Sequence, residues 1–309
     1  MAAIRDMRIG MRVSVAAVFA TLVLLLVPSS SLAEHAEHVA ASEPSVAGTC
    51  AACHDAIVQQ YGTTRHGKAD QFGLEGYGSC ASCHGDVAAH AESADPTKIF
   101  NPGKASLAES SAKCLRCHGN QHERAFWEGG LHEASNVGCL SCHSIHHSLS
   151  PDKLLVKRSE NLTCLACHVE QRKAMTQRST HFFRDELQRA TMQCSGCHNA
   201  HGSQTERMLR ENSLNDTCLR CHTEKRGPFL WEHAPVQESC LNCHSPHGSN
   251  NINLLSLRAP QLCQTCHMQG KHQTVSGFAN SPWVLNRACL NCHSQIHGSN
   301  HPSGLKLWR

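Results

Sequence analysis

The sequence has 309 residues, with 28 Lys and Arg against 25 Asp and Glu, and a formal net charge of +3. Because the charge is near neutral and no basic run or patch is present, nothing indicates a nucleic-acid partner. Apolar residues make up 40% of the chain and aromatic residues 5%, which is little material for the side-chain core of a chain this long. We therefore expect something other than side chains to fill the interior.

The N-terminus has the layout of a secretory signal. Three arginines precede an apolar run from Val13 to Val27, and Ser31-Leu32-Ala33 follows. This order predicts a signal peptide at residues 1–33 with cleavage before Glu34. The alternative is an uncleaved membrane anchor, but the run is shorter than the roughly 20 residues that span a bilayer. Residues 34–49 would then form a short N-terminal segment, and residues 50–309 the main domain.

Ten copies of the motif Cys-x-x-Cys-His contain all twenty cysteines. The cysteines are Cys50, Cys53, Cys80, Cys83, Cys114, Cys117, Cys139, Cys142, Cys164, Cys167, Cys194, Cys197, Cys218, Cys221, Cys240, Cys243, Cys263, Cys266, Cys289 and Cys292. The motif histidines are His54, His84, His118, His143, His168, His198, His222, His244, His267 and His293. Two thiols at this spacing can form thioethers with the vinyl groups of one haem, and the adjacent histidine can bind its iron. Disulfides and zinc sites do not require a histidine at that position. The motifs thus predict ten covalently attached c-type haems.

The broad apolar faces of ten haems can replace the missing side-chain core. The predicted secondary structure is therefore sparse, with short helices at the motifs joined by loops and no strand pattern of useful length. Asn161 before Cys164, and Asn215-Asp216 before Cys218, are read as helix start signals.

Fifteen further histidines lie outside the motifs, and ten of them form a repeat with the motifs. Taken two motifs at a time, the chain reads motif, lone histidine, motif, lone histidine, which gives five two-haem units at 50–90, 114–146, 164–201, 218–247 and 263–297. One lone histidine per haem predicts a second axial imidazole for every iron. The predicted distal ligands are His66, His90, His132, His146, His181, His201, His233, His247, His272 and His297.

Several alternatives to these ligands remain. His122 and His301 compete for distal positions, and His146 is preferred to its neighbour His147 because it keeps the repeat spacing. His35 and His38 lie near the predicted cleavage site and are expected to be solvated. Met175, Met192 and Met208 could also bind iron, although a spare imidazole exists for each site. The pairing of distal histidines with haems cannot be read from the sequence.

Three segments resemble the MtrA, PioA and DmsE family of periplasmic decahaem cytochromes. They are EKRGPFLWEHAPV at 224–236, RAPQLC at 258–263 and CLNCHSQIHGSNHPSG at 289–304. The likeness extends from about Cys50 to Gly304 and includes all ten motifs in order; the short segment before Cys50 and the extra His122 and His147 depart from it. The resemblance implies a multihaem cytochrome c, with short helices and loops wrapped around an extended chain of ten bis-His haems.

The resemblance also implies partners and a location. They are an outer-membrane β-barrel porin, an extracellular multihaem cytochrome or terminal reductase or oxidase, and periplasmic or inner-membrane cytochromes. The protein would sit in the periplasm, associated with the outer membrane through the barrel. It would transfer electrons between the periplasm and the cell exterior, in iron, metal or sulfoxide respiration.

The ligand set itself favours electron transfer over catalysis, because two imidazoles saturate each iron and leave no position for a substrate. The same ligation predicts low haem potentials. Two alternatives use the same residues: a soluble periplasmic electron shuttle or store, and a multihaem reductase, which would need at least one iron with an open position. The direction of electron flow is not encoded in these motifs.

Overall fold

The structure is a computed structural model that describes residues 46–73, 77–150, 153–181, 192–268 and 288–308. All of these belong to one unit, residues 44–309. The predicted signal peptide, residues 34–45 and the predicted distal ligand His272 lie outside the described residues.

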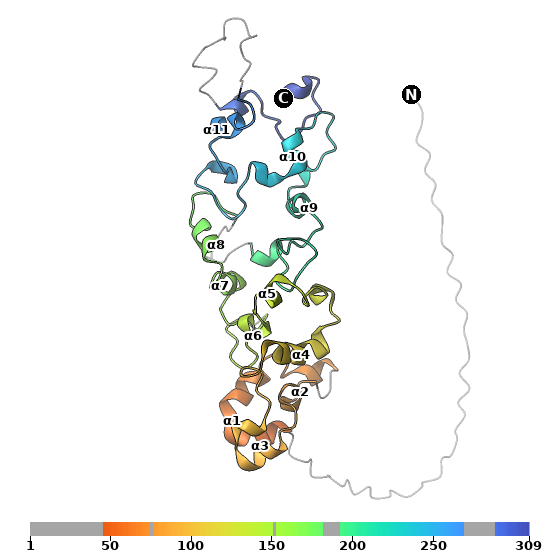
Figure 1. The fold of residues 1–309 in the computed structure, drawn as a ribbon, viewed down its shortest axis with the longest axis vertical. Coiled ribbons are helices and arrows are strands. Elements are labelled where there is room, and N and C mark those ends of the chain that lie inside the picture. The colour runs from red at the N-terminus through yellow and green to blue at the C-terminus, as the bar shows by residue number, and fades with distance from the viewer. Residues whose placement is uncertain (1–45, 74–76, 151–152, 182–191, 269–287, 309) are drawn as a thin grey trace, which may run out of the picture. The chain divides into compact units, whose positions relative to one another are not determined.

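The secondary structure consists of short helices joined by loops (Figure 1). The α-helices are α1 (Val46–Gly62), α2 (Cys80–His84), α3 (Ala88–Ser93), α4 (Leu107–His118), α5 (Leu131–Ala134), α6 (Cys139–Cys142), α7 (Glu160–Cys164), α8 (Val169–Ala174), α9 (Leu214–Leu219), α10 (Ala234–Glu238) and α11 (Ala259–Gln264). The 3₁₀ helices are η1 (Ala69–Phe72), η2 (Pro96–Lys98), η3 (His122–Arg124), η4 (Cys194–Gly196), η5 (Thr223–Lys225), η6 (Cys240–Asn242), η7 (Ile252–Leu254), η9 (Cys289–Asn291) and η10 (Gly304–Lys306). No β-strand forms within the described ranges, where the only pairing of this kind is at isolated antiparallel bridges such as His143 with Leu155. The predicted fold class is thereby confirmed.

Serine side chains cap three of the helices that carry motifs, α4, α7 and α9. Ser106 accepts a hydrogen bond from the Glu109 amide (3.3 Å), and the Glu109 carboxylate accepts one from the Ser106 amide (3.0 Å), so α4 starts with a capping box. Ser159 caps α7 and Ser213 caps α9 in the same position. The predicted start signals were therefore placed two residues too late, because Ser159 and Ser213 provide the caps.

Asn161 and Asn215 instead lie inside the first turn of α7 and α9 and bind the next motif. The Asn161 side-chain oxygen accepts from the Cys194 amide (3.1 Å), and that of Asn215 accepts from the Cys240 amide (2.9 Å). Each asparagine thus ties one motif helix to the motif that follows it. A local start signal does not reveal this role, because the partner lies some 25 to 33 residues away.

From the second unit onward, the helix that carries all or the beginning of the first motif packs against the turn of the second motif. The packed pairs are α4 with α6, α7 with η4, α9 with η6 and α11 with η9. This arrangement repeats along the chain, as the spacing of motifs and lone histidines predicts. It gives each unit the same pair of motif-bearing elements.

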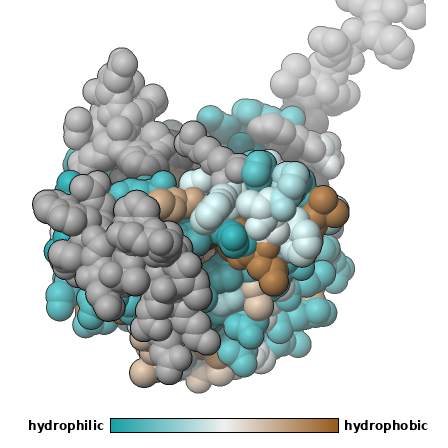
Figure 2. Space-filling view, turned by 90° about the horizontal axis from the view of Figure 1, so that it is seen from above, coloured by the Kyte–Doolittle hydropathy of each residue, from teal (hydrophilic) through white to brown (hydrophobic). Residues whose placement is uncertain are grey.

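Few apolar side chains are buried among the described residues. They are Ala69, Trp127, Leu155, Leu165, Leu255 and Leu307. On the face drawn in Figure 2 hydrophilic residues predominate and apolar ones form small groups. This scarcity agrees with the composition, since side chains alone do not supply the core that a chain of this length normally buries. Among the residues that the structure describes, no helix has both the length and the apolar content to cross a membrane.

Candidate haem-binding sites

The two motifs of a unit have different conformations. We number the sites 1 to 10 in the order of their motifs. The odd motifs lie within or at the end of a longer helix, as Cys114 to His118 do in α4. From site 4 onward the even motifs form a single turn, α6, η4, η6 or η9. At sites 4, 6 and 8 the motif histidine then makes an antiparallel bridge to a leucine 11 or 12 residues further on.

Nine of the ten motif histidines face one predicted distal histidine each, with ring centres 5.8–6.2 Å apart. In site order, the pairs are His54–His90, His84–His146, His118–His66, His143–His201, His168–His132, His198–His247, His222–His181, His244–His297 and His267–His233. The remaining motif histidine is His293, and the remaining predicted ligand is His272, which lies outside the described residues. The structure thus brings together residues whose pairing the sequence left open.

The spacing of these rings fits an iron held between two imidazoles. Two metal–nitrogen bonds of about 2.0 Å, plus about 1.1 Å from each nitrogen to its ring centre, place the ring centres about 6.2 Å apart. The observed values of 5.8–6.2 Å match this sum, whereas rings in direct contact can approach to about 4.5 Å. A haem iron, which takes four further ligands from its porphyrin, suits such a pair.

The pairs connect neighbouring units. At each junction, the second motif histidine of one unit pairs with the trailing histidine of the next, as His143 does with His201. The first motif histidine of the later unit pairs with the histidine between the motifs of the earlier unit, as His168 does with His132. In contrast, His54 pairs with His90 inside the first unit. Eight sites therefore lie across four junctions.

Backbone carbonyls fix the orientation of one imidazole at most sites. At even sites Nδ1 of the motif histidine is hydrogen-bonded, at 2.6–2.9 Å, to the carbonyl oxygen of a residue further along the chain. The pairs are His84 with Phe100, His143 with Lys153, His198 with Arg207, His244 with Asn253 and His293 with Lys306. At odd sites 1, 5 and 7 the distal histidine does so instead, each at 2.9 Å: His90 with Asp95, His132 with Ala200 and His181 with Pro246. Because a carbonyl can only accept, Nδ1 carries the proton and Nε2 keeps its lone pair for a metal.

Residues in the left-handed backbone conformation follow several of these carbonyls and set their orientation. Leu154, Met208 and Leu307 have φ of 50–51°, and each directly follows the residue whose carbonyl binds a motif histidine. Non-glycine residues rarely adopt this conformation, which costs on the order of 1 kcal/mol or more. Because the same strained conformation recurs at the same position, we infer that it serves to orient the carbonyl toward the histidine.

Burial favours the neutral form of several distal imidazoles. Burial, followed by the charge of Arg124, lowers the pKa of His201 to about 4. Burial also lowers the pKa of His66, His146, His247 and His297. Since only a neutral imidazole can bind a metal, these side chains are ready to act as ligands at neutral pH.

Thiols of consecutive motifs lie next to one another. Within units, a hydrogen bond from the Cys114 thiol lowers the pKa of Cys139 to about 6. Burial and then the neighbouring Cys240 raise the pKa of Cys218 to about 12. Cys50 stands beside Cys80, Cys164 beside Cys194, and Cys263 beside Cys289 in the same way. None of the twenty cysteines forms a disulfide.

Between units, it is the second cysteines that approach each other. Burial and then the neighbouring thiol raise the pKa of Cys83 beside Cys117, and of Cys197 beside Cys221. Cys243 stands beside Cys266 in the same way, and Cys142 lies near both thiols of site 5. Together with the contacts inside units, these approaches link each motif to the next one in the sequence.

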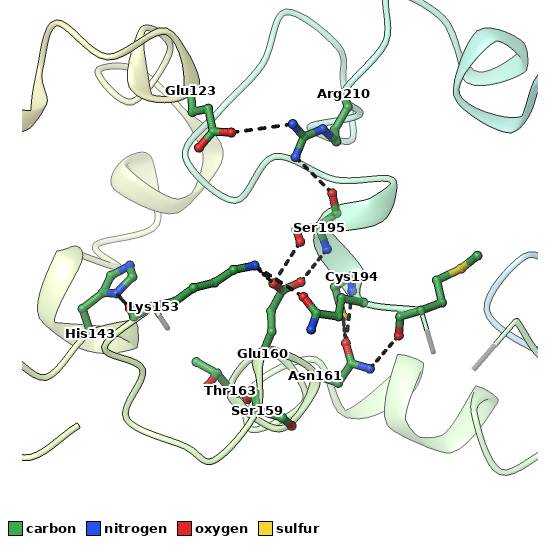
Figure 3. A network of polar contacts seen from close by, with 12 residues as sticks. Glu123, His143, Lys153, Ser159, Glu160, Asn161, Thr163, Cys194, Ser195 and Arg210 are labelled. Carbon is green, nitrogen blue, oxygen red and sulfur yellow. Dashed lines mark hydrogen bonds and ion pairs between the residues drawn. The ribbon is translucent and has the colours of Figure 1, made fainter. Parts of the chain in front are cut away.

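A carboxylate joins three successive sites in the middle of the chain (Figure 3). The Glu160 side chain is 11% exposed and lies 2.5 Å from Lys153 Nζ. It also accepts hydrogen bonds from the amide (2.6 Å) and hydroxyl (2.9 Å) of Ser195. Although burial opposes ionisation, the hydrogen bonds from Lys153 and Ser195 lower the pKa of Glu160. Glu160 thus connects the loop of site 4 and the helix of site 5 to the turn of site 6.

The competing residues take other roles. His301 Nδ1 accepts from the Ser303 amide (3.1 Å), and His122 is exposed. His147 Nδ1 donates to the Gln60 side chain (2.8 Å), so His146 is the member of that pair that faces a motif histidine. In the part of the chain that the structure describes, neither His122 nor His301 pairs with a motif histidine. Sequence reasoning missed the carbonyl acceptors, because backbone groups leave no sequence pattern. It also missed that Asn161 and Asn215 bind the next motif, because their partners are distant in the sequence.

Comparison with known proteins agrees with this architecture. The doubled CXXCH motif matches residues 188–227 and 233–272, and the cytochrome c-type protein NrfB-like family matches residues 80–159. The multiheme cytochrome MtrA of Shewanella baltica (strain OS185) is 40% identical over 284 residues, which cover 86% of this chain and 82% of that protein. The chain belongs to the MtrA family of multihaem cytochromes. The predicted resemblance is confirmed.

Membership of the MtrA family makes the chain a c-type cytochrome with covalently bound haem, and an electron-transfer protein rather than an enzyme. A solved structure of the undecaheme cytochrome from the S-layer of Carboxydothermus ferrireducens is also similar, with 20% identity and a TM-score of 0.16. The match covers 75% of this chain and 32% of that one, about a third of its length.

Proposed function

We propose that this MtrA-family protein carries electrons along ten haems, each held by two histidines, between the periplasm and the cell exterior. The observation that carries the proposal is the set of nine histidine pairs with ring centres 5.8–6.2 Å apart. In this proposal the twenty motif cysteines form the thioethers and the nine pairs supply the axial ligands. His293 and His272 bind the tenth haem.

Bis-histidine ligation favours transport over a reaction at iron. The haem supplies reversible one-electron chemistry when bound. The paired imidazoles would hold the iron from both sides, and the carbonyls of Phe100, Lys153 and Ala200 keep the rings in place. An arrangement that changes little between redox states suits electron transfer, whereas a multihaem reductase would need an exchangeable position.

The contacts between thiols support a series in sequence order. The Cys50 and Cys80 thiols are within hydrogen-bond reach inside the first unit, and the Cys83 thiol lies near that of Cys117 at the junction with the second. The same alternation continues to Cys263 and Cys289. Since each thiol bonds the edge of its haem, neighbouring thiols bring neighbouring haem edges together. We therefore place the haems in the order of their motifs, without branches.

Transfer to the cell exterior requires a path through the outer membrane. Family membership supports an outer-membrane β-barrel porin as that path, because a closed barrel can enclose a polar object within lipid. We propose that the protein is exported by its signal peptide and inserts into such a barrel. It would then meet periplasmic or inner-membrane cytochromes on one side and an extracellular multihaem cytochrome or terminal oxidoreductase on the other.

Reconstitution tests the conduit. The protein is purified from membranes with any barrel that accompanies it and inserted into liposomes that contain a reduced redox dye. An external ferric chelate should oxidise the dye only when both barrel and cytochrome are present. The matched control lacks one haem in the middle of the series, through Cys164→Ala and Cys167→Ala. That variant should block transfer while the barrel is still inserted.

The alternatives predict different results. A soluble electron shuttle or store would leave with the soluble periplasm and would exchange electrons in solution, but not across the liposome membrane. A multihaem reductase would show a high-spin haem and bind carbon monoxide. A haem content well below ten per chain, measured by mass spectrometry, would contradict the ligand assignment itself.

A further inference from the structure

Site 3 departs from the pattern of carbonyl acceptors. Its two histidines, His118 and His66, both have a buried Nδ1 with no hydrogen-bond partner. The side chain of Gln121 approaches the His118 ring but makes no well-directed bond with Nδ1. At site 9 His233 Nδ1 also lacks a well-directed bond, yet the Ile296 carbonyl lies beside it. Among the described pairs, site 3 alone has no carbonyl next to either ring.

The reason lies in the residue that follows the distal histidine at each junction. In three units the sequence is His-Gly-Ser, at 201–203, 247–249 and 297–299. Gly202 passes the preceding unit so closely that a Cβ would overlap the Phe126 carbonyl oxygen, and at Gly248 a Cβ would overlap that of Ala174. This approach brings the carbonyl before the distal histidine to the other ring, as Ala200 reaches His132. The absence of a side chain is what permits the contact.

The first junction has a histidine at this position. The second unit reads His146-His147-Ser148. The exposed His147 side chain donates to the side chain of Gln60 in the first unit (2.8 Å). Ile145 corresponds in position to Ala200 and Pro246, but His66 does not bond with its carbonyl. At this junction the side-chain contact from His147 to Gln60 thus stands where the next two junctions have a close approach of backbone to backbone.

We propose that His147, standing where the three later units have glycine, leaves site 3 without carbonyl acceptors and makes the haem held by His66 and His118 the most easily reduced of the series. This rests on the proposed function, in which these histidines are axial ligands. An imidazole that donates from Nδ1 is more basic and stabilises ferric iron, so a site that lacks the carbonyl bond found at the other sites has a higher reduction potential. The positive charge of Arg124 near His118 acts in the same direction. Site 3 would therefore retain an electron when the other haems are oxidised.

The geometry of the same pair provides a spectroscopic label. The His66 and His118 rings are 77° apart, the largest angle among the described pairs, and six of the other pairs lie within 12–26°. Near-perpendicular imidazoles make the orbitals of low-spin ferric iron almost degenerate, which produces the most anisotropic electron paramagnetic resonance signal. In a redox titration of the intact protein, we expect that signal to disappear at the most positive potential of all. Disappearance in the middle of the range, or at its negative end, would overturn the proposal.

Three variants assign the effect. Gln121→Glu places a carboxylate acceptor beside His118, so the midpoint of the most anisotropic signal should fall. His147→Gly should lower the same midpoint by allowing the closer approach of the units. Asn120→Asp adds the same charge as Gln121→Glu at an exposed neighbour and is the matched control, with a smaller shift. Equal shifts in Gln121→Glu and Asn120→Asp would count against a hydrogen-bond effect.

The haem count and spin state separate this proposal from the proposed function. Ten low-spin haems in every protein, with the anisotropic signal at an ordinary potential, would defeat only the inference about site 3. Fewer haems, or a high-spin signal in the wild type, would defeat the bis-histidine assignment and with it the wire.

Discussion

His143 and His201 belong to different units, yet their ring centres lie 6.2 Å apart with the planes only 12° from parallel. His54 and His90, in contrast, form a similar pair inside one unit. An iron bound between His143 and His201 would join the second unit to the third, whereas one between His54 and His90 would stabilise the first unit alone. The two pairs should therefore respond differently when a ligand is removed.

His201→Ala should open the junction between the second and third units. We expect limited proteolysis to cleave the variant in the segment between Ser148 and Glu160 at a rate at least tenfold above that of the wild type, since local opening governs cleavage. His90→Ala is the matched control and should show new cleavage only within the first unit. Equal cleavage at the junction in both variants would contradict ligation across units.

His297→Met should raise the potential of one haem. A thioether in place of an imidazole stabilises ferrous iron, so one component of a potentiometric titration should move to a clearly more positive value. The other components should shift little, apart from those of neighbouring haems. His301→Met changes an exposed histidine that pairs with no motif histidine in the described residues, and its titration should match that of the wild type. A change in both variants would argue against His297 as a ligand.

Asn161→Ala should destabilise the third unit. Asn161 is 6% exposed, donates to the Met192 carbonyl (3.0 Å) and accepts from the Cys194 amide (3.1 Å). Loss of these bonds leaves buried backbone groups unpaired, at a cost of about 1–3 kcal/mol. Thermal unfolding followed by circular dichroism should show a lower Tm. Asn212→Ala, at an exposed position in the loop before α9, should leave the Tm almost unchanged.

Parts of this architecture follow from the sequence, and others depend on distant contacts. The sequence predicts the motif histidines because covalent haem attachment requires a fixed local spacing, and it predicts distal ligands because histidines such as His132, His181 and His233 recur in step with the motifs. The pairing itself was not predictable, since His143 meets a residue 58 positions away. Whether neighbouring units make a close backbone contact depends on the residue that follows the distal histidine. The effect of His147 becomes visible only by comparison with Gly202 and Gly248, each of which closely approaches a carbonyl of the preceding unit.

Glu160→Gln should make stability less dependent on pH. The folded-state pKa of Glu160 lies below its ordinary value of 4.5, so its carboxylate stabilises the fold fully above about pH 5 and progressively less as the pH falls below about 4.5. We expect the variant to lose about 1–3 kcal/mol at pH 7, where the bonds with Lys153 and Ser195 are intact in the wild type. The difference in unfolding free energy between the two proteins should shrink in acid.

The matched control is Glu170→Gln. Glu170 lies exposed in the first turn of α8, and its replacement should cost little at any pH. If Glu170→Gln and Glu160→Gln have the same pH profile, the network around Glu160 does not contribute the expected stabilisation.

The exchange of histidines at the junctions also sets how such a chain can change length. Each inner unit supplies one distal histidine to the unit before it and one to the unit after it, and each of those units supplies one distal histidine to it. Excision of the third unit would therefore let His143 pair with His247 and His222 pair with His132. Every remaining iron would still have two imidazoles. Removal of a single motif would instead leave one distal histidine without an iron. Chains of this design should therefore grow and shrink in steps of two haems, with the ends kept and the middle interchangeable.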